Sequence, residues 1–306
     1  MEMNLVKAEP PRRPLSRSEQ WKSATPFVLS HLAVLGAFWS GVTWTAVVLC
    51  FVLLFVRLWG ITAGYHRYFA HRTYKTGRVF QFVLAVLAQS SSQKGVLWWA
   101  AHHRVHHKLS DHEGDVHSPV QNGFLYAHVG WIFDDTEETR WDKIRDFAKY
   151  PELRWLNKFW ALPPTLLALA CLWIAGWPGL FIGFFLSTVL LWHNTFLINS
   201  VTHVWGKKRF DTNDESRNNL VTALLTLGEG WHNNHHHYQS SCRNGFYWWE
   251  IDATYYMLKL LSWVGLVWDI RGVPARVLEE GRRRDAGDLD GEQTRGQPPE
   301  KLTLAA

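Results

Sequence analysis

Histidines crowd at three places in this 306-residue sequence, and imidazole is the commonest metal ligand in proteins. The densest stretch reads AHHRVHHK, from Ala101 to Lys108. On a helix, positions three and four apart share a face, so His103, His106 and His107 can present three imidazoles to one point. This spacing predicts metal ligation.

Two other clusters carry the same chemistry. His232, His235 and His236 repeat the offsets of three and four, and His66 and His71 lie five apart. Neutral imidazoles in water have no reason to gather, and charged ones repel each other unless a metal takes their lone pairs. We therefore expect the fold to assemble the three clusters into one site.

The number of histidines predicts two metal ions. The three clusters supply eight imidazoles, which exceeds the four ligands of a closed zinc site, and His203 makes nine if it joins them. Imidazole suits iron, copper, zinc and nickel alike, so the ligand type does not choose the metal. No cluster holds a carboxylate of the H-E-x-x-H kind, which favours oxygen activation at iron over zinc hydrolysis. Single histidines are expected to pack or to lie at the surface: His31, His112, His117, His128 and His193.

Apolar segments of the sequence must position these clusters. Residues 26–62 are almost uncharged apart from Arg57 and are long enough for two spans, near 26–42 and 44–64, hinged at Ser40-Gly41. The second of these should run directly into His66. A second hairpin is expected at 159–175 and 179–202, turned by the residues from Gly176 to Gly179.

The remaining sequence is more polar and predicts a helical cap, residues 66–158 and 203–275. Within it, 79–101 is expected to be a helix along the membrane face, and the aromatic-rich stretch 246–268 an interfacial amphipathic helix. Residues 1–24 and 276–306 are charged and rich in Pro or Gly and are expected to be disordered. The fold class is thus an all-α integral membrane protein with four transmembrane helices and one domain over 25–275.

Composition agrees with a membrane location. There are 19 Trp residues, and Trp favours the membrane-water boundary. A net charge of +5 suits a protein held against anionic lipid, and no nucleic-acid reader motif is present. The basic N-terminal segment predicts cytoplasmic termini and a cytoplasmic site, in a bacterial inner membrane or an ER-type membrane.

The motifs HRYFAH at 66–71, HRVHH at 103–107 and HNNHH at 232–236 resemble the three histidine boxes of the membrane fatty acyl desaturases. The stretches GITAGYHRYFAHRTYK, HSPVQNGFLYAHVGW, NSVTH and GEGWHNNHHH resemble the delta-9, stearoyl-CoA-desaturase-like branch of that family. The similarity runs from about residue 26 to residue 275.

The resemblance implies a four-helix membrane stem and a cytosolic cap with a di-iron centre. Matched motif by motif, the implied ligands are His66, His71, His103, His106, His107, His203, His232, His235 and His236, with Asn199 holding a water. His102 and His237 match no family ligand, and we expect them to lie behind the ligands or at the surface.

The resemblance also implies the reaction. An external donor supplies two electrons, O2 is the oxidant, and two neighbouring methylene carbons of a long acyl chain become a cis double bond, most often at the ninth carbon. An apolar tunnel would hold the chain, and Thr195, Phe196 and Trp99 are candidates for its lining. No haem or iron-sulfur motif is present, so ferredoxin or cytochrome b5 with its reductase is the expected donor. Lys207, Lys208 and Arg209 either receive it or form an ordinary solvated loop.

Two departures leave the acyl carrier open. Where animal acyl-CoA enzymes of this family have an Arg-Asp pair before the second box, this sequence has Ala101-His102. Where they have an Arg-Lys pair after HVGW, this sequence has Ile132 and Phe133 followed by Asp134 and Asp135. Acyl-CoA, an acyl carrier protein and a glycerolipid all remain candidates. A lipid hydroxylase using the same chemistry and a non-enzymatic membrane metal-binding protein are the rival functions.

Overall fold

The computed structural model describes residues 15–134 and 138–287, and this part of the chain is mostly helical. The elements in order are α1 (Arg17–Val34), α2 (Gly36–Ser40), α3 (Trp44–Trp59), η1 (Gly60–Ala70), β1 (Lys75–Thr76), α4 (Arg78–Gln89), α5 (Val96–Leu109), α6 (Pro119–Asn122), α7 (Phe124–His128), η2 (Gly130–Phe133), η3 (Trp141–Lys143), α8 (Arg145–Ala148), α9 (Pro151–Lys158), α10 (Leu162–Pro178), η4 (Gly179–Leu186), α11 (Ser187–Ser200), η5 (Val201–His203), α12 (Leu220–Leu225), α13 (His232–His237), α14 (Ala253–Trp263), β2 (Val267–Trp268) and α15 (Ala275–Asp285). The two short strands pair antiparallel. The expectation of a mainly helical chain is confirmed.

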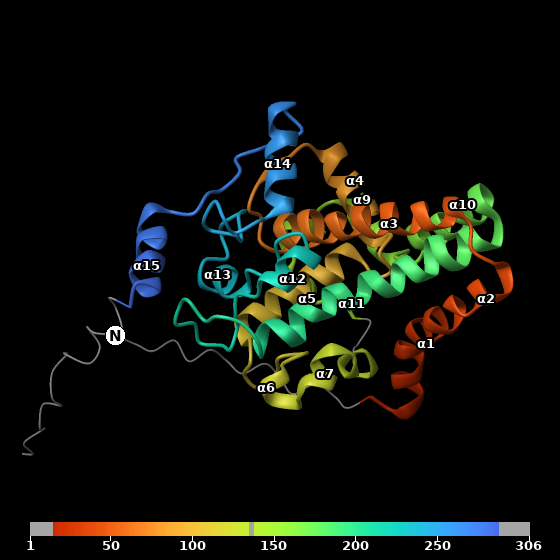
Figure 1. Cartoon of the computed structure of the whole chain (residues 1–306), viewed down its shortest axis with the longest axis horizontal. Helices are drawn as coiled ribbons and strands as arrows, with labels where there is room; N and C mark the ends of the chain where they lie inside the picture. Colours follow the sequence, from red (N-terminus) through yellow and green to blue (C-terminus); the bar gives the residue numbers. More distant parts are fainter. Residues whose placement is uncertain (1–14, 135–137, 288–306) are drawn as a thin grey trace, which may run out of the picture.

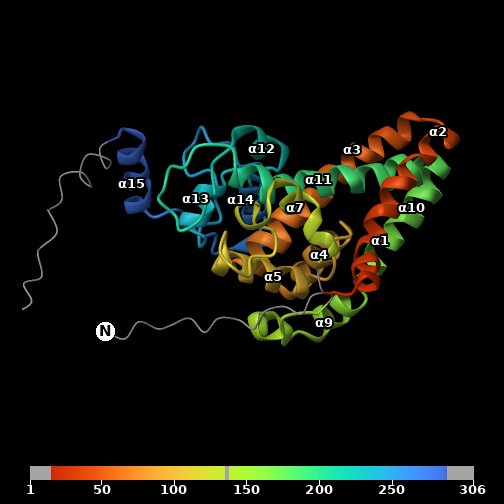
Figure 2. The ribbon, with the colours of Figure 1, turned by 90° about the horizontal axis from the view of Figure 1, so that it is seen from below.

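The molecule is elongated, with a bundle of long helices at one end and shorter elements at the other (Figures 1 and 2). The bundle contains α1, α2, α3, α10 and α11, and the opposite end contains α12, α13 and α15. The largest hydrophobic core lies where the two parts meet. It packs η1 against α4, α5, α9 and α14, through buried residues such as Phe69, Leu84, Leu97, Leu153 and Leu258.

The first hairpin of the bundle turns after Ser40. Gly41 has a φ of 76°, a left-handed conformation that favours glycine, and the Thr43 side chain then accepts a hydrogen bond from the Ala46 N–H to begin α3. The helix continues without a break from α3 into η1 and so delivers His66, as the sequence indicated.

The second hairpin turns at Ala175 and Gly176, where the backbone leaves helical geometry. Gly176 has a φ of 61°. Both hairpin turns lie at the same end of the bundle, where the Trp39 and Trp177 rings pack 5.7 Å apart (Figure 1). The two helices of each hairpin therefore run antiparallel, and the ends of each hairpin opposite its turn are directed toward the histidines.

Three helical stretches are long and apolar enough to cross a membrane: Arg17–Ser40, Trp44–Ala70 and Leu162–His203. The third is 42 residues long and contains the reversal at Gly176. The reversal divides this stretch into two separate helical parts, one before Ala175 and one after Gly176.

η1 is a π-helix, and this explains how His66 and His71 share a site. In a π-helix the backbone bonds run from residue i to i+5, so residues five apart lie one above the other. The His71 N–H donates to the His66 carbonyl at 3.1 Å, and the two imidazole rings lie 4.7 Å apart. In an α-helix, a spacing of five would place them on different faces.

Three regions differ from the expectations. The segment 79–101 is two helices, α4 and α5, because the polar residues 90–95 form a turn between them. Residues 17–24, expected to be disordered, form the start of α1, because Ser16 and Glu19 make a capping box. Residues 276–285, also expected to be disordered, form most of α15, while 1–14 and 288–306 lie outside the described residues.

The stretch 246–268 is also not one helix. Only Ala253–Trp263 is helical, and residues before it form turns around buried Glu250 and Asp252. Both carboxylates accept hydrogen bonds there, Glu250 from the Asn234 amide at 2.9 Å and Asp252 from the Asn244 N–H at 2.7 Å. These bonds hold residues 244–252 in an irregular path that a continuous helix would not allow.

Candidate metal centre

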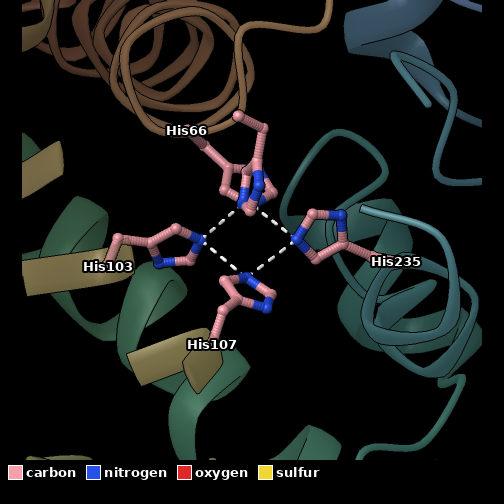
Figure 3. A group of neighbouring side chains, drawn as sticks. His66, His103, His107 and His235 are labelled. Carbon is pink, nitrogen blue, oxygen red and sulfur yellow. Dashed lines mark hydrogen bonds between the residues drawn. The ribbon is translucent and has the colours of Figure 1, made fainter. Parts of the chain in front are cut away.

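Five histidines from three parts of the fold converge on one point. His66 comes from η1 and His71 follows it, His103 and His107 come from α5, and His235 comes from α13. Figure 3 shows His66, His103, His107 and His235 directed toward a common centre. Neighbouring Nε2 atoms are 3.0 Å apart for His66 and His235, 3.0 Å for His235 and His107, 2.9 Å for His107 and His103, and 2.9 Å for His103 and His71. We call this set the first histidine group.

Hydrogen bonds alone cannot account for these contacts. A neutral imidazole Nε2 has either one proton or one lone pair, so it can take part in one hydrogen bond. The five nitrogens make four contacts in a row, and at most two of the four can be hydrogen bonds. Nitrogens about 2.1 Å from one ion and at right angles to each other lie roughly 3 Å apart, which matches the observed distances. The first histidine group therefore fits a transition metal.

Four more histidines form a second group beside the first: His106, His203, His232 and His236. The Nε2 atoms of His203 and His232 are 3.0 Å apart. His236 Nε2 is buried and has no hydrogen-bond partner in the described residues. A buried lone pair without a partner is costly unless an ion takes it. The second histidine group therefore also fits a metal.

Neighbouring residues of α5 and α13 serve different groups. His106 belongs to the second group, whereas His103 and His107 belong to the first, so the expectation that these three imidazoles meet at one point is wrong. Adjacent positions on a helix point about 100° apart, which separates His106 from His107. On α13, His235 faces the first group while His232 and His236, four residues apart, face the second. The rings of His107 and His236 lie 4.3 Å apart, so the two groups are in contact.

Four carboxylates hold the outer nitrogens of four of these histidines. The Nδ1-to-oxygen distances are 2.7 Å for His66 and Glu229, 2.9 Å for His106 and Asp115, 2.8 Å for His203 and Asp111, and 2.6 Å for His236 and Asp214. A carboxylate on Nδ1 keeps the proton there, which leaves the Nε2 lone pair free for a metal.

These carboxylates are ionised at neutral pH. Burial alone would raise the pKa of Asp115, but the His106 imidazole holds it well below its ordinary value. Burial would likewise raise the pKa of Glu229, yet Arg67 and His66 lower it. Arg67 contacts both Glu229, at 2.8 Å, and Asp252, at 2.9 Å, and is itself buried.

The sequence reasoning missed all four carboxylates. None of them lies inside a histidine cluster as in H-E-x-x-H: Asp111 and Asp115 follow the second cluster, and Glu229 precedes the third. The spacing of four between Asp111 and Asp115, just after HRVHHK, is the signal that was available. Asp214 lies in a separate loop and has no such signal.

A cavity of about 490 Å³ leads to the histidine groups. His66, His103, His232 and Asn199 are among the residues that line it. The predicted tunnel residues Trp99, Thr195 and Phe196 all line this cavity. The Trp99 ring stacks on that of His103 at 4.9 Å. Acidic Glu113 and Asp134 stand at its exposed rim, and no Lys or Arg of the described residues lines it.

The remaining histidines lie outside the two groups. His102 stacks on Trp98 at 4.0 Å, and His237 stacks on Phe210 at 4.0 Å. His31, His193 and His128 form a row of contacts between α1, α11 and α7, at 3.1 and 3.0 Å.

The basic stretch 207–209 is paired with carboxylates rather than free. Lys207 contacts Asp285 at 2.6 Å, Lys208 contacts Glu215 at 3.4 Å, and the buried Arg209 contacts Asp285 at 3.0 Å and Glu250 at 2.5 Å. Because these cations are already paired, they are less suited to bind an acidic electron-donor protein.

The sequence profile of one family, fatty acid desaturase, matches residues 42–267. The chain belongs to the fatty acid desaturase family. It is therefore an oxidoreductase acting on fatty acyl chains. The match includes both histidine groups and every residue that lines the cavity except Leu15, and it excludes α1 and α15.

Similar desaturases differ in substrate. A chloroplastic palmitoyl-monogalactosyldiacylglycerol delta-7 desaturase of Arabidopsis thaliana is 37% identical over 74% of this chain and 62% of its own length. An sn-2 palmitoyl-lipid 9-desaturase of a Nostoc species is 34% identical over 89% of this chain and 97% of its own. An acyl-CoA C20 Delta5-desaturase of Anemone leveillei is 35% identical over 77% of this chain and 76% of its own. The fold thus serves several double-bond positions and more than one acyl carrier.

Proposed function

We propose that this desaturase introduces a cis double bond at the ninth carbon of a long acyl chain carried on a membrane glycerolipid. The observation that carries the proposal is the cavity that ends at two interleaved histidine groups. One acyl CH2–CH2 unit, O2, two electrons and two protons give one double bond and two waters, so the electrons must come from a separate protein. Ferredoxin or cytochrome b5 with its reductase fits that role.

The residues present fit two iron ions. The first histidine group would hold one ion and the second group the other, with Asn199 at the cavity wall holding a water for the second. Bound and reduced, the irons supply the O2-dependent oxidation of an unactivated C–H bond. Glu229, Asp115, Asp111 and Asp214 orient the imidazoles and balance the positive charge.

The cavity wall supplies the positional selectivity. All methylenes of an acyl chain are chemically alike, so only the fixed shape of the cavity can place two of them beside the irons. Trp99, Thr195 and Phe196 form this wall next to His103. The packing of Trp99 on His103 makes the wall rigid at the point where the chemistry occurs.

The charge at the cavity rim favours a glycerolipid over acyl-CoA. CoA bears several phosphate charges, and within residues 15–134 and 138–287 the rim offers Glu113 and Asp134 but no Lys or Arg. Tyr126 donates to Asp134 at 3.0 Å, which holds this acid in place. Relatives that are named as acyl-lipid 9-desaturases, including those of Nostoc and of Anabaena variabilis, support the same substrate class.

Four membrane spans fit the two hairpins, formed by α1–α2, α3–η1, α10 and η4–α11. Both hairpin turns would lie on the outer side of the membrane, and the termini and the histidine groups on the cytoplasmic side. Arg17 and Lys22 at the start of α1 agree with this orientation. A bacterial inner membrane or an ER-type membrane satisfies it equally.

Expression in a host that cannot make unsaturated fatty acids tests this function. We expect growth without added unsaturated fatty acid, with double bonds at the ninth carbon found in glycerolipids before they appear in the CoA pool. Oxygen incorporated into the product would indicate a hydroxylase, and a double bond first seen on acyl-CoA would contradict the lipid carrier.

His106→Ala tests the metal assignment in the same host. We expect this variant to insert normally and to lose at least 95% of the activity, because the second group would keep only three imidazoles. His112→Ala serves as the matched control and should keep full activity, because His112 is exposed and lies just after the end of α5. Retained activity in His106→Ala would remove this residue from the ligand set.

A further inference from the structure

Arg57 is a buried cation in an otherwise uncharged span. It lies in α3, with 1% of its surface exposed, and among the described residues no carboxylate forms an ion pair with it. Ionisable side chains at membrane depth are costly and are rarely retained without a role. The histidine groups and their carboxylates do not involve Arg57.

Neutral oxygens from three elements hold the guanidinium. Nε donates to the Leu53 carbonyl at 3.1 Å, Nη1 to Thr188 Oγ1 at 2.8 Å and to the Ser90 carbonyl at 3.3 Å, and Nη2 to Ser187 Oγ at 2.5 Å. The hydroxyls of Ser187 and Thr188 donate back to the Phe184 carbonyl, at 2.9 and 2.7 Å, so their lone pairs face Arg57. Arg57 thus joins α3, α11 and the end of α4 at one point.

The end of α4 leads into a turn, residues 90–95, whose backbone conformation is unfavourable for two of its own residues. Ser92 and Lys94 have φ values of 61° and 62°, in the left-handed region that non-glycine residues avoid. Contacts from outside hold it: Arg57 binds the Ser90 carbonyl, and the Trp192 indole donates to the Ser91 carbonyl at 2.9 Å. The turn is therefore fixed by its neighbours.

This turn forms part of the cavity wall. Gln93 lines the cavity that reaches the histidine groups, and its side chain donates to Thr195 at 2.8 Å and accepts from the Trp99 indole at 3.2 Å. Gln93, with Ser92 and Lys94, also lines a second cavity of about 110 Å³, which has residues of α1 and α11 in its wall. Trp99 and Phe196 belong to both cavities. A shift of the turn would therefore move the wall that the two cavities share.

We propose that Arg57 is a positioning residue that fixes the turn 90–95 and thereby determines which acyl carbons lie beside the histidine groups. The proposal rests on the proposed desaturase function. Arg57 contacts neither the acyl chain nor the histidines in this arrangement and acts through the Ser90 carbonyl and Gln93. A purely stabilising role would change the amount of folded protein and would leave the double-bond position unchanged.

The test measures the positions of double bonds formed by Arg57 variants. Arg57→Met keeps the size and flexibility of the side chain but removes its donors, and Arg57→Lys keeps the charge without the planar fork. Each variant is expressed in the host without unsaturated fatty acids, and product isomers are quantified per mole of membrane-inserted protein. We expect at least a fivefold larger share of off-position isomers for Arg57→Met and a smaller increase for Arg57→Lys.

Changing the acceptors provides a second route to the same question. Ser187→Ala with Thr188→Val leaves Arg57 in place but removes two of its partners, and we expect the isomers to shift in the same direction. Arg78→Met is the matched control, because Arg78 is exposed, pairs with Glu152 at 2.7 Å and lies over the Tyr150 ring, and lines neither cavity, so its isomer pattern should be that of the unchanged chain.

The outcomes separate the two proposals. If Arg57→Met does not accumulate, Arg57→Lys and the Ser187/Thr188 double variant decide the matter by the same measurement. Variants that lose activity only in proportion to their abundance, with the original isomer pattern, would overturn the role of Arg57 and leave the desaturase assignment intact. No unsaturated product from the unchanged chain would overturn the proposed function and this inference together.

Discussion

Carboxylates hold individual imidazoles of the two histidine groups through Nδ1, the ring nitrogen that is not available to the metal. His106 shows the principle best, because it is buried and its Nδ1 lies 2.9 Å from Asp115. The same carboxylate accepts the Asp111 N–H at 2.9 Å, so the acid itself cannot turn away. The metal-binding nitrogen is therefore directed by a residue that would never touch the metal.

Asp115→Asn tests this orienting role. The amide keeps the size and one acceptor of the carboxylate but loses the negative charge that favours the Nδ1 proton, so we expect iron affinity of the second histidine group to fall by about 10- to 100-fold. Iron per protein, measured during titration with a competing chelator, gives the value.

Asp142→Asn is the control for that experiment. Asp142 is exposed and pairs with Lys143 at 3.1 Å, away from the histidines, and the change should leave iron affinity as it was. Equal iron binding by both variants would mean that Asp115 serves packing rather than ligand orientation.

Sequence alone identified the residues of the site better than their grouping. The offsets of three and four located the histidines, but an offset of three within HRVHH did not reveal that His106 turns to the second group. That choice depends on His203 and His232, which come from distant parts of the chain. Asp214 was hidden for the same reason, because a side chain from a remote loop leaves no local periodicity.

Among the elements, α5 depends most on its neighbours for its start. Its N-cap is Gly95, which has no side chain to accept the free N–H groups of the first turn. Gln89 accepts from the Val96 N–H at 3.0 Å, and Asn157 of α9 accepts from Leu97 and Trp98 at 3.0 and 2.9 Å. A Cβ at position 95 would lie 2.2 Å from the Asn157 oxygen, so glycine is required for this contact.

Asn157→Ala removes that remote cap. Two buried N–H groups lose their acceptor, and we expect a loss of about 1–3 kcal/mol in the free energy of unfolding. Thermal unfolding in detergent measures it, with the exposed Asn122→Ala as the control of equal chemistry. Unchanged stability in Asn157→Ala would show that water replaces the lost acceptor.

The boundaries of helices could be predicted from the sequence where the residues that determine them lie at the boundary itself. The turn after Ser40 and the direct passage into His66 were anticipated from uncharged length and glycine. The π-helical form of η1 was not, because its one sequence signal, the spacing of five between His66 and His71, does not by itself specify a π-helix. The helices at both ends were missed because charge and proline content outweighed the capping pair of Ser16 and Glu19.

At the scale of the whole molecule, the polar centre is buried at the junction of the bundle and the cap. Burial and neighbouring imidazoles lower the pKa of His103, His107 and His235 well below 6.5. The folded protein without metal therefore keeps these histidines neutral in weak acid, whereas the unfolded chain takes up protons.

The metal-free protein should consequently lose stability as the pH falls below 6.5. The unfolded state binds more protons in that range, so the free energy of unfolding decreases by roughly 1.4 kcal/mol for each such histidine at pH 5.5. Thermal unfolding of chelator-treated protein between pH 7.5 and 5.5 measures the slope. A flat profile would mean that the folded imidazoles also accept protons, contrary to their burial.

The alternation of neighbouring residues along α5 and α13 has a consequence for any change in chain length. Inserting one residue between His103 and His106 would give the His106 ring the offset of four that now directs His107 to the first group, and would leave no imidazole at the offset of three that faces the second group. The number of residues between these histidines thus sets which group each imidazole joins. Neither side-chain rotation nor loop movement could compensate for a change in that number.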